Sequence, residues 1–593
     1  MKQFNTDVSK VLSIVINSLY KDKDVFVREL VSNASDACEK RRFLSLQESE
    51  DFSGVISVRV DKDLKTIHIE DNGVGMNKED LEEKLGTIGK SGSFDFKNQN
   101  KINMENIIGQ FGVGFYSCFM VADKVDVKSS DNGKTGYLWS SNGVDGYTID
   151  AIEKNERGTE VVLHIKSDED KYLDIFTIEN IVQIYSSNIS CDIFLKDSEG
   201  VNKIINPSSS RIWKKTKNDT TSQEYKSFYE SMHCSSEEPF LKIHSKIEGE
   251  IEFYTLLFAP AVKPFNLFHP DRIKTVKLYS KGVLIDDSAD LLPAYLRFVK
   301  GVVDMPNLPL NVSRDSVQAT GLLRKVKKIV TNKILKEISD IQKDSELYAN
   351  FYSNYGQVLK EGLCDPEIVD KDVLLELISF ETNKSDGVKI NLREYLKRNP
   401  DVKEIVYLAG ENVEDLKATP ELEICEKNNL EVVFLTDQVD YFWPSTTKNY
   451  KDKSFKSIKD LNLDTGIDTS KDETGFEKLF VEVLAKRVAA VKISNKLIDS
   501  PACVSVAGDG IDLKMERMLF EQKHIQHRRP KILEINPNHK IIKSISEGLK
   551  NNDEKSKKAA NLILDLALIA SGDIVEKPAS FVKDLYEFFK VSE

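Results

Sequence analysis

The sequence has few cysteines for its length, and they are scattered. It holds seven in 593 residues, and no two of them form a CxxC pair. This spacing excludes a zinc knuckle and argues against a disulfide-stapled scaffold, so we expect reduced, mostly buried thiols. The eight histidines are equally dispersed and form no HExxH motif.

Long hydrophobic runs and a targeting segment are also missing. Met1 to Val8 is polar, and no apolar core of signal-peptide length follows it. The longest apolar run, Leu562 to Ala570, is interrupted by Asp565 and is too short to cross a bilayer. We therefore expect a cytoplasmic protein with no membrane partner.

Positive charge is in deficit. Lys and Arg number 83 against 96 Asp and Glu, which gives a net charge of −13 at pH 7. Dedicated nucleic-acid binders normally carry the opposite balance, so no nucleic-acid partner is expected. Gly and Pro are also sparse, at 29 and 16 residues, beside 40% apolar and 30% charged residues. That composition is typical of a folded, soluble protein and excludes a disordered or fibrous one.

The chain is too long for a single hydrophobic core. Two polar stretches, Asp197 to Ser210 and Asp464 to Gly475, have the composition of loops. They predict three domains, at residues 1–205, 211–470 and 476–593.

Periodicity within these segments indicates a mixed α/β (α+β) fold. The first segment alternates helix and strand patterns, which favours an α/β sandwich. The middle segment is also mixed, with a strand predicted over Glu250 to Leu257 and a helix over Leu322 to Ile341. The last is mainly helical, and Pro578 marks a helix start.

The first chemical pattern lies on a helix predicted over Val25 to Arg42. Glu29, Asn33 and Asp36 fall at i, i+4 and i+7, opposite its apolar stripe. Two carboxylates and an amide oxygen suit Mg²⁺, and a carboxylate there could orient a water toward a phosphoryl group. An ordinary solvated helix face explains the same spacing.

The second pattern joins two strand ends. Asp71 shares the parity of Ile67 and Ile69, so it points to the buried side, where a carboxylate needs a partner such as the exocyclic amine of adenine. Thr159 opens the strand predicted to Ile165 with the same inward parity. The alternatives are an Asx-capped hairpin turn after Asp71 and an ordinary packed threonine.

The third pattern is the GxxGxG run from Gly109 to Phe115, which suits a phosphate cradle of backbone N–H groups. Gly86 to Ser91 ends like a P-loop but has two residues between its glycines where four are needed. Lys90 could still meet a phosphate as a point charge. Residues 86–115 are predicted to form a mobile lid over the site.

Longer phrases carry a family resemblance across all three segments, most weakly in the last. Four of them resemble the GHKL ATPases and, within these, the heat-shock protein 90 chaperones: FVRELVSNASDA (26–37), DNGVGM (71–76), LGTIGKSG (85–92) and IGQFGVGFYS (108–117). The likeness continues through YLRFVKGVVDMPNLPLNVSRD (295–315) and NYGQVLKEGL (354–363). The short first joint and the absence of an acidic MEEVD ending resemble the bacterial members. Gly89 and Asp315 depart from the usual family phrases.

The resemblance implies an ATP-dependent chaperone that works as a homodimeric clamp, with ATP and Mg²⁺ as its cofactors. Glu29 would polarise the attacking water, Asn33 would hold Mg²⁺, and Arg314 would reach the γ-phosphate from the middle domain. The remaining nucleotide contacts it implies are Asp36, Asp71, Gly75, Met76, Lys90, Gly109, Gln110, Phe111, Gly112, Val113, Gly114, Phe115 and Thr159.

Partners follow partly from residues and partly from the resemblance. Lys557 to Ala570 and Pro578 to Lys590 are apolar enough to form a seam between subunits or, equally, a core within one domain. The resemblance favours a homodimer through the C-terminal domain. It also implies non-native client proteins, contacted by the Met-rich helix predicted over 508–520, and a co-operating heat-shock chaperone system.

Three other functions compete with this interpretation. A DNA-acting ATPase would share the nucleotide site, but the acidic balance disfavours it. A histidine kinase needs a phospho-accepting histidine helix before the site, and no histidine precedes Glu29. A scaffold that uses ATP only as a structural ligand would not need a water-orienting carboxylate there.

Overall fold

The computed structural model describes residues 20, 22–90, 107–109, 112–196, 202–206, 211–232, 236–270, 272, 274–309, 320–368, 371–461, 473–484, 487–494, 496–506 and 513–590. The chain divides into two compact units, residues 1–340 and 341–593. Each unit contains more than one hydrophobic core. The three-domain boundaries set out above stay a prediction.

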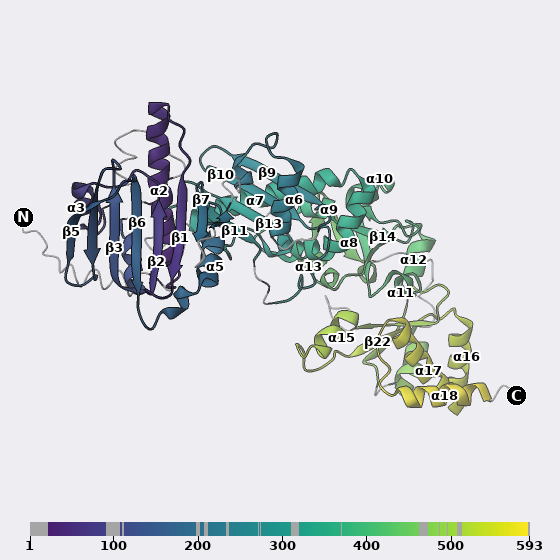
Figure 1. The fold of residues 1–593 in the computed structure, drawn as a ribbon. Coiled ribbons are helices and arrows are strands. Elements are labelled where there is room, and N and C mark those ends of the chain that lie inside the picture. Colours follow the sequence, from purple (N-terminus) through teal and green to yellow (C-terminus); the bar gives the residue numbers. More distant parts are fainter. Residues whose placement is uncertain are drawn as a thin grey trace, which may run out of the picture. The chain divides into compact units, whose positions relative to one another are not determined.

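An eight-stranded sheet forms the N-terminal part of the described first unit, in the order β5-β4-β3-β6-β2-β1-β7-β8. Its neighbours pair antiparallel except for β1 and β7, which are parallel. Helices α2 and α5 lie against it (Figure 1). The elements are α2 Val25–Glu48, β1 Val55–Asp61, β2 Thr66–Asp71, α3 Lys78–Lys84, η1 Gly114–Met120, β3 Ala122–Ser130, β4 Thr135–Ser141, β5 Tyr147–Glu153, β6 Gly158–Ile165, η2 Asp170–Leu173, α5 Ile175–Ser186, β7 Asp192–Lys196 and β8 Asn202–Asn206.

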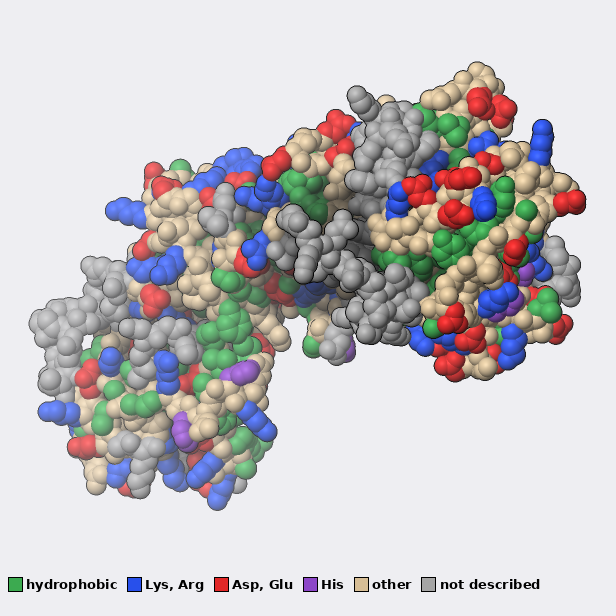
Figure 2. Space-filling model, turned by 90° about the vertical axis from the view of Figure 1, so that its left-hand side faces the viewer, with side chains coloured by type: hydrophobic (Ala, Val, Ile, Leu, Met, Phe, Trp, Pro, Cys, Tyr) green, Lys and Arg blue, Asp and Glu red, His purple; other side chains and the backbone are tan. Residues whose placement is uncertain are grey.

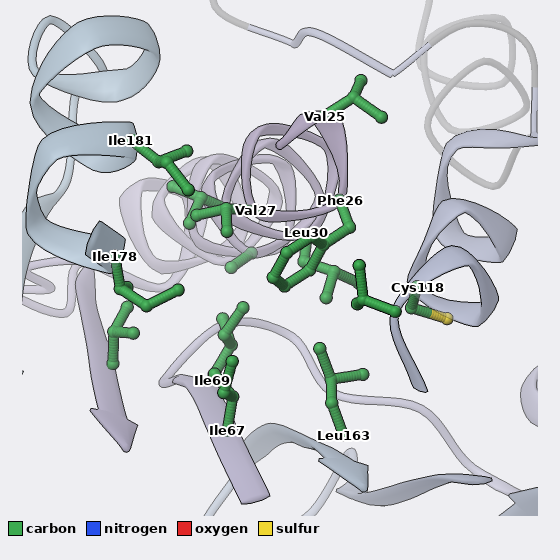
Figure 3. Packing of buried hydrophobic residues seen from close by; sticks show 14 of the residues in the cluster. Val25, Phe26, Val27, Leu30, Ile67, Ile69, Cys118, Leu163, Ile178 and Ile181 are labelled. Carbon is green, nitrogen blue, oxygen red and sulfur yellow. The ribbon is translucent and has the colours of Figure 1, made fainter. Parts of the chain in front are cut away.

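The core between α2 and the sheet fixes how α2 is rotated. Figure 3 shows Val27 and Leu30 directed from α2 toward Ile67 and Ile69 of β2 and Leu163 of β6, and all five are buried. Burying each such side chain contributes roughly 1.5–3 kcal/mol. Because this stripe must face the sheet, the polar residues of α2 are held at defined angles around the helix.

The first predicted joint is not all loop. Residues 202–206 form strand β8, which pairs with β7. The Asn206 amide is buried and bonds both to the Ile193 N–H (2.6 Å) and to the Cys191 carbonyl (2.9 Å). The expectation of an irregular linker over Asp197 to Ser210 is therefore wrong for these five residues, because sheet pairing overrides their polar composition.

A five-stranded sheet in the order β12-β11-β13-β10-β9 follows in the same unit. The strand expected from Glu250 begins only at Phe253, because residues 249–252 form the turn after β9 and Gly249 has φ of 137°. The elements are η3 Ile212–Lys214, α6 Ser222–Ser231, β9 Leu241–Ile247, β10 Phe253–Ala259, β11 Val276–Ser280, β12 Val283–Asp286, η4 Ala294–Leu296, β13 Lys300–Asp304 and α7 Thr320–Ile341.

The second unit has two further sheets, ordered β15-β14-β17-β16-β19-β18 and β20-β22-β21. The helices predicted near residues 322–341, 557–570 and 578–590 are confirmed as α7, α17 and α18. The three-stranded sheet is an addition to the mainly helical C-terminal segment that was expected. The elements are α8 Ser345–Glu361, η5 Gly362–Cys364, α9 Asp372–Leu377, β14 Ser379–Thr382, β15 Ile390–Asn391, α10 Leu392–Arg398, β16 Glu404–Ala409, α11 Val413–Lys417, α12 Leu422–Lys427, β17 Val433–Leu435, η6 Gln438–Tyr441, α13 Trp443–Thr446, β18 Asn449–Tyr450, β19 Lys453–Ser457, η7 Ile458–Asp460, α14 Glu473–Leu484, β20 Ala490–Ile493, β21 Ala502–Val506, α15 Leu513–Glu521, β22 Lys531–Ile535, α16 Lys540–Lys550, α17 Glu554–Ala570 and α18 Pro578–Lys590.

Charge is mixed over the surface. On the face shown in Figure 2, acidic and basic side chains are interspersed, so the net charge of −13 does not gather there into one field. Among the described helices, none is both long enough and apolar enough to cross a membrane.

Candidate active site

A cavity of about 380 Å³ opens between α2, the adjoining ends of β2 and β6, and the glycine-rich segment that leads into η1. Twelve of the residues predicted for the site line it: Glu29, Asn33, Asp71, Gly75, Met76, Lys90, Gly109, Gly112, Val113, Gly114, Phe115 and Thr159. Asp36 does not line it. Gln110, Phe111 and Arg314 lie outside the described residues.

The inner end of the cavity carries Asp71 and Thr159. Both belong to the buried side of their strands, as their parity predicted, and the structure adds that they are directly opposite each other in the β2–β6 register. Thr159 Oγ1 lies 2.8 Å from Ser129 Oγ, which also accepts the Met76 N–H at 2.9 Å. Asp71 of β2, Ser129 of β3 and Thr159 of β6 therefore form a cluster of polar side chains on three neighbouring strands.

Burial dominates the electrostatics of Asp71. It raises the pKa of the carboxyl from its ordinary value of 3.8 to about 7, although backbone N–H groups of Gly73 and Thr159 oppose the rise. The Gly73 N–H donates to Asp71 Oδ1 at 2.8 Å. An acid in this position lacks enough donors to stabilise its charge, so a ligand that brings another donor would complete it.

The turn after Asp71 needs its glycines. A Cβ on Gly73 would lie 2.5 Å from the Ala37 backbone, and one on Gly75, whose φ is 69°, would lie 1.9 Å from the Ser130 carbonyl oxygen. Both contacts are impossible for a side chain, so only glycine lets this turn pack between α2 and β3. Arg157 Nε donates to the Val74 carbonyl at 3.1 Å and holds the turn from the β6 side.

Glu29 lies at the opposite end of the cavity, against the glycine loop. Its side chain is 5% exposed, and Arg28 Nη2 is 3.4 Å from its Oε1. A Cβ on Gly114 would lie only 2.2 Å from Glu29 Oε2, so glycine is needed there for the loop to approach the carboxylate. Asn33, one turn further along α2, is exposed and also lines the cavity.

Asp36 is directed to the protein backbone. Its Oδ1 accepts the Ile108 N–H at 2.6 Å and its Oδ2 accepts the Gly109 N–H at 2.7 Å, and the side chain is buried. The sequence grouped Asp36 with Glu29 and Asn33 as ligands on one helix face. In the structure it instead binds the backbone at the start of the glycine loop.

The described parts of the predicted lid meet at the cavity. The Gly89 N–H donates to the Gly112 carbonyl at 3.2 Å. Gly112 has φ of 67°, and a Cβ on it would lie 2.4 Å from the Lys90 carbonyl oxygen. Lys90 lines the cavity, and its ammonium pairs with Glu83.

Several polar residues of the cavity were missed by sequence reasoning. Asp131 and Arg157 sit on turns with no telling pattern, while Lys84 pairs with Asp80 at 2.5 Å on α3. Lys40 could have been found, because it falls seven residues after Asn33 and so on the same face of α2. Burial lowers the pKa of its ammonium.

Comparison with known proteins gives two family matches and a set of close relatives. Residues 22–168 match the model described as "Histidine kinase-, DNA gyrase B-, and HSP90-like ATPase", and residues 196–592 match the "Hsp90 protein" model. Similar curated proteins include "Chaperone protein HtpG" of Rickettsia massiliae (strain Mtu5), 43% identical over 98% of this chain and 97% of the relative. The proteins of the same name from Rickettsia akari (strain Hartford) and Rickettsia typhi (strain ATCC VR-144 / Wilmington) are 43% and 42% identical, over 98% and 99% of both chains respectively.

Proposed function

The chain belongs to the Hsp90 family, and on that premise we propose that the cavity beside α2 binds ATP and holds it for hydrolysis by a water that Glu29 orients. The protein is an ATPase and an ATP-dependent molecular chaperone. The convergence of Asp71, Thr159 and Glu29 on one cavity from three separate elements carries the assignment of the site.

The inner end of the cavity suits adenine. The Asp71 carboxylate would accept the exocyclic amine, and the Thr159 hydroxyl, already bonded to Ser129, offers a second polar contact beside it. Met76 and Gly75 line the same region. Because the adenine amine is a donor, it would stabilise the ionised form of a carboxyl whose pKa burial has raised to about 7.

The outer end suits phosphates and Mg²⁺. Gly109, Gly112 and Gly114 line the cavity with backbone. Lys90 lines it as well, and its ammonium, now paired with Glu83, would add a positive charge by turning to the phosphates. Mg²⁺ is usually held by only one or two protein oxygens together with substrate phosphates. The exposed Asn33 amide beside the cavity fits that requirement, and the bound ion would neutralise charge that develops on the phosphates.

Glu29 is placed for acid–base work. Its carboxylate would accept a hydrogen bond from a water whose oxygen attacks the γ-phosphorus. The bond from the γ-phosphorus to the bridging oxygen breaks, and the proton lost by the water passes to Glu29. Arg314, outside the described residues, would stabilise the γ-phosphate charge, as the family resemblance implies.

Steady-state ATP hydrolysis and ATP binding test this site in wild type, Glu29→Ala and Asp71→Asn. Glu29→Ala should bind ATP yet hydrolyse it at least a hundredfold more slowly, while Asp71→Asn should lose binding. Glu48→Ala, on the exposed end of the same helix, is the matched control and should behave as wild type. Hydrolysis by Glu29→Ala at the wild-type rate would place the base elsewhere.

The chaperone would act as a homodimer joined through residues 476–593. Val582, Tyr586 and Phe589 of α18 lie at i, i+4 and i+7 and are 43%, 66% and 67% exposed. Leu566 and Ile569 of α17 are exposed as well. Apolar side chains aligned on one helix face support a self-complementary seam.

The remaining partners follow from family membership. Non-native proteins would be the clients, with α15 as one contact surface, since Met515 and Met518 lie on a short amphipathic helix. A cytoplasmic location and a co-operating heat-shock chaperone system belong to the same proposal. Suppression of aggregation of a denatured model protein, with and without ATP, tests the client role.

A further inference from the structure

Two charged side chains hold the segment Ile107–Gly109, which ends at the first glycine of the glycine loop. One belongs to helix α2 and the other to the turn between β11 and β12 of the five-stranded sheet. Both isoleucines are buried, at 2% and 6% exposure. The backbone groups of this segment nevertheless have hydrogen-bond partners. A carboxylate accepts the Ile108 and Gly109 N–H groups, and an ammonium donates to the Ile107 carbonyl. Charged partners make the stronger class of hydrogen bond, so this segment is held firmly for an irregular stretch.

The carboxylate is Asp36. It belongs to α2, the helix that also carries Glu29 and Asn33, and both of its oxygens point at the segment, at 2.6 and 2.7 Å. A buried carboxylate that accepts two backbone N–H groups is satisfied without any ligand. Asp36 thus ties the loop to the same helix that bears the proposed catalytic glutamate.

The ammonium is Lys281, 174 residues away in the chain. It is 5% exposed and occupies the tight turn between β11 and β12, with φ of 55°. Its backbone is fixed, since the Lys281 N–H donates to Asp304 Oδ1 at 2.9 Å and Asp304 Oδ2 accepts the Trp213 indole N–H at 2.9 Å. The lysine side chain therefore extends from a rigid base.

The turn also packs against the segment between α5 and β7, beside the eight-stranded sheet. A Cβ on the next residue, Gly282, would lie 2.2 Å from the Asn188 carbonyl oxygen, so the two backbones are in close contact there. Val283, one residue further, is buried in the core of the N-terminal sandwich. Lys281 thus reaches the loop across a packed interface, which limits how far its ammonium can move.

We propose that Lys281 is a positioning residue for the ATPase reaction. Together with Asp36 it fixes the backbone of Ile107–Gly109 and so sets where the glycine loop meets the nucleotide phosphates. This inference rests on the proposed nucleotide site, and it goes beyond it by making a turn of the five-stranded sheet an indirect determinant of phosphate binding. Lys281 does not line the cavity, so it acts through the backbone it holds.

Binding of adenosine, ADP and ATP by the full-length chain separates this role from a general structural one. In Lys281→Met, which keeps the length but loses the donor, ATP affinity should fall about tenfold. ADP affinity should fall less and adenosine affinity should stay at the wild-type value. Lys281→Arg retains a cationic donor and should recover most of the ATP affinity. Lys277→Met removes an exposed lysine of the adjacent strand β11 and is the matched control.

A uniform loss for all three ligands in Lys281→Met, or no loss for any, overturns the proposal. If wild type and Lys277→Met fail to bind ATP, the proposed site itself fails, which is a different outcome. Should Lys281→Met not fold, amide hydrogen exchange in the wild type decides, with Lys281→Arg as comparison. The Ile108 and Gly109 amides must exchange slowly before nucleotide is added, and fast exchange there refutes the positioning role.

Discussion

The pH dependence of the proposed adenine site follows from one buried carboxyl. Burial raises the Asp71 pKa from 3.8 to about 7, which corresponds to the ionised form being disfavoured by on the order of 4 kcal/mol relative to water. In the proposed site the adenine amine would donate a hydrogen bond to Asp71 and so favour that ionised form. Binding therefore lowers the pKa of Asp71 and releases a proton wherever the pH is below about 7.

The magnitude follows from the ionised fraction. If only the carboxylate binds well, about a tenth of the protein is competent at pH 6 and nearly all of it at pH 8. The adenosine dissociation constant should thus weaken roughly tenfold from pH 8 to pH 6 and stay flat above it. Adenosine is the right ligand for calorimetric titration, because it lacks phosphates that ionise in the same range.

The raised pKa of Asp71 also makes the stability of the nucleotide-free protein depend on pH. A pKa raised in the folded state means that the native protein binds an extra proton between about pH 4 and 7, so stability falls as pH rises through that window. Asp71→Asn removes the charge and should stabilise the N-terminal unit by roughly 1–4 kcal/mol at pH 8, with little effect at pH 5. An adenosine affinity independent of pH between about 6 and 8, or an asparagine variant less stable than wild type at pH 8, would refute the reasoning.

Three further perturbations test other contacts. Gly114→Ala should slow hydrolysis by roughly a hundredfold in single-turnover assays, because its Cβ would lie 2.2 Å from Glu29 Oε2 and displace that carboxylate; an unchanged rate would contradict the packing. Phe589→Ser should shift the chain toward monomers in sedimentation at micromolar concentration, since this ring is 67% exposed, and a persistent dimer would move the seam off α18. Glu423→Gln should speed amide exchange at residues 498–500, whose three N–H groups its Oε2 accepts at 2.9–3.2 Å; undiminished protection would show that other contacts hold that segment.

Local periodicity was enough to predict that Asp71 and Thr159, the residues of the proposed adenine end, are buried. The alternation along residues 66–71 put Asp71 on the buried face, and the same rule put Thr159 on the buried face of its own strand; the pairing of the two strands is seen only in the structure. Both inferences depend only on side chains alternating along a strand. The α2 pattern likewise placed Glu29 and Asn33 at the cavity.

Contacts between distant residues were beyond such rules. Asp36 looked like a third member of the helix-face set, but its partners lie 72 and 73 residues on. Lys281 sits in a two-residue turn whose sequence gives no hint of the carbonyl it meets. Strand β8 was mistaken for linker because its pairing energy comes from β7, which composition does not report.

The two ends of the cavity differ in how far the protein's own groups satisfy their hydrogen bonds. At the proposed adenine end, burial disfavours the ionised form of Asp71, and a ligand that donates a hydrogen bond would stabilise it. At the proposed phosphate end, Asp36 and Lys281 already satisfy backbone groups of Ile107–Gly109. A preorganised backbone stabilises charge that develops on the phosphates during hydrolysis without having to rearrange. A buried acid that lacks donors instead makes affinity depend on the hydrogen bond that the adenine base supplies. The affinity for adenosine should therefore depend on pH. The additional affinity that the phosphates of ATP contribute should depend on the position of the β11–β12 turn, which carries Lys281.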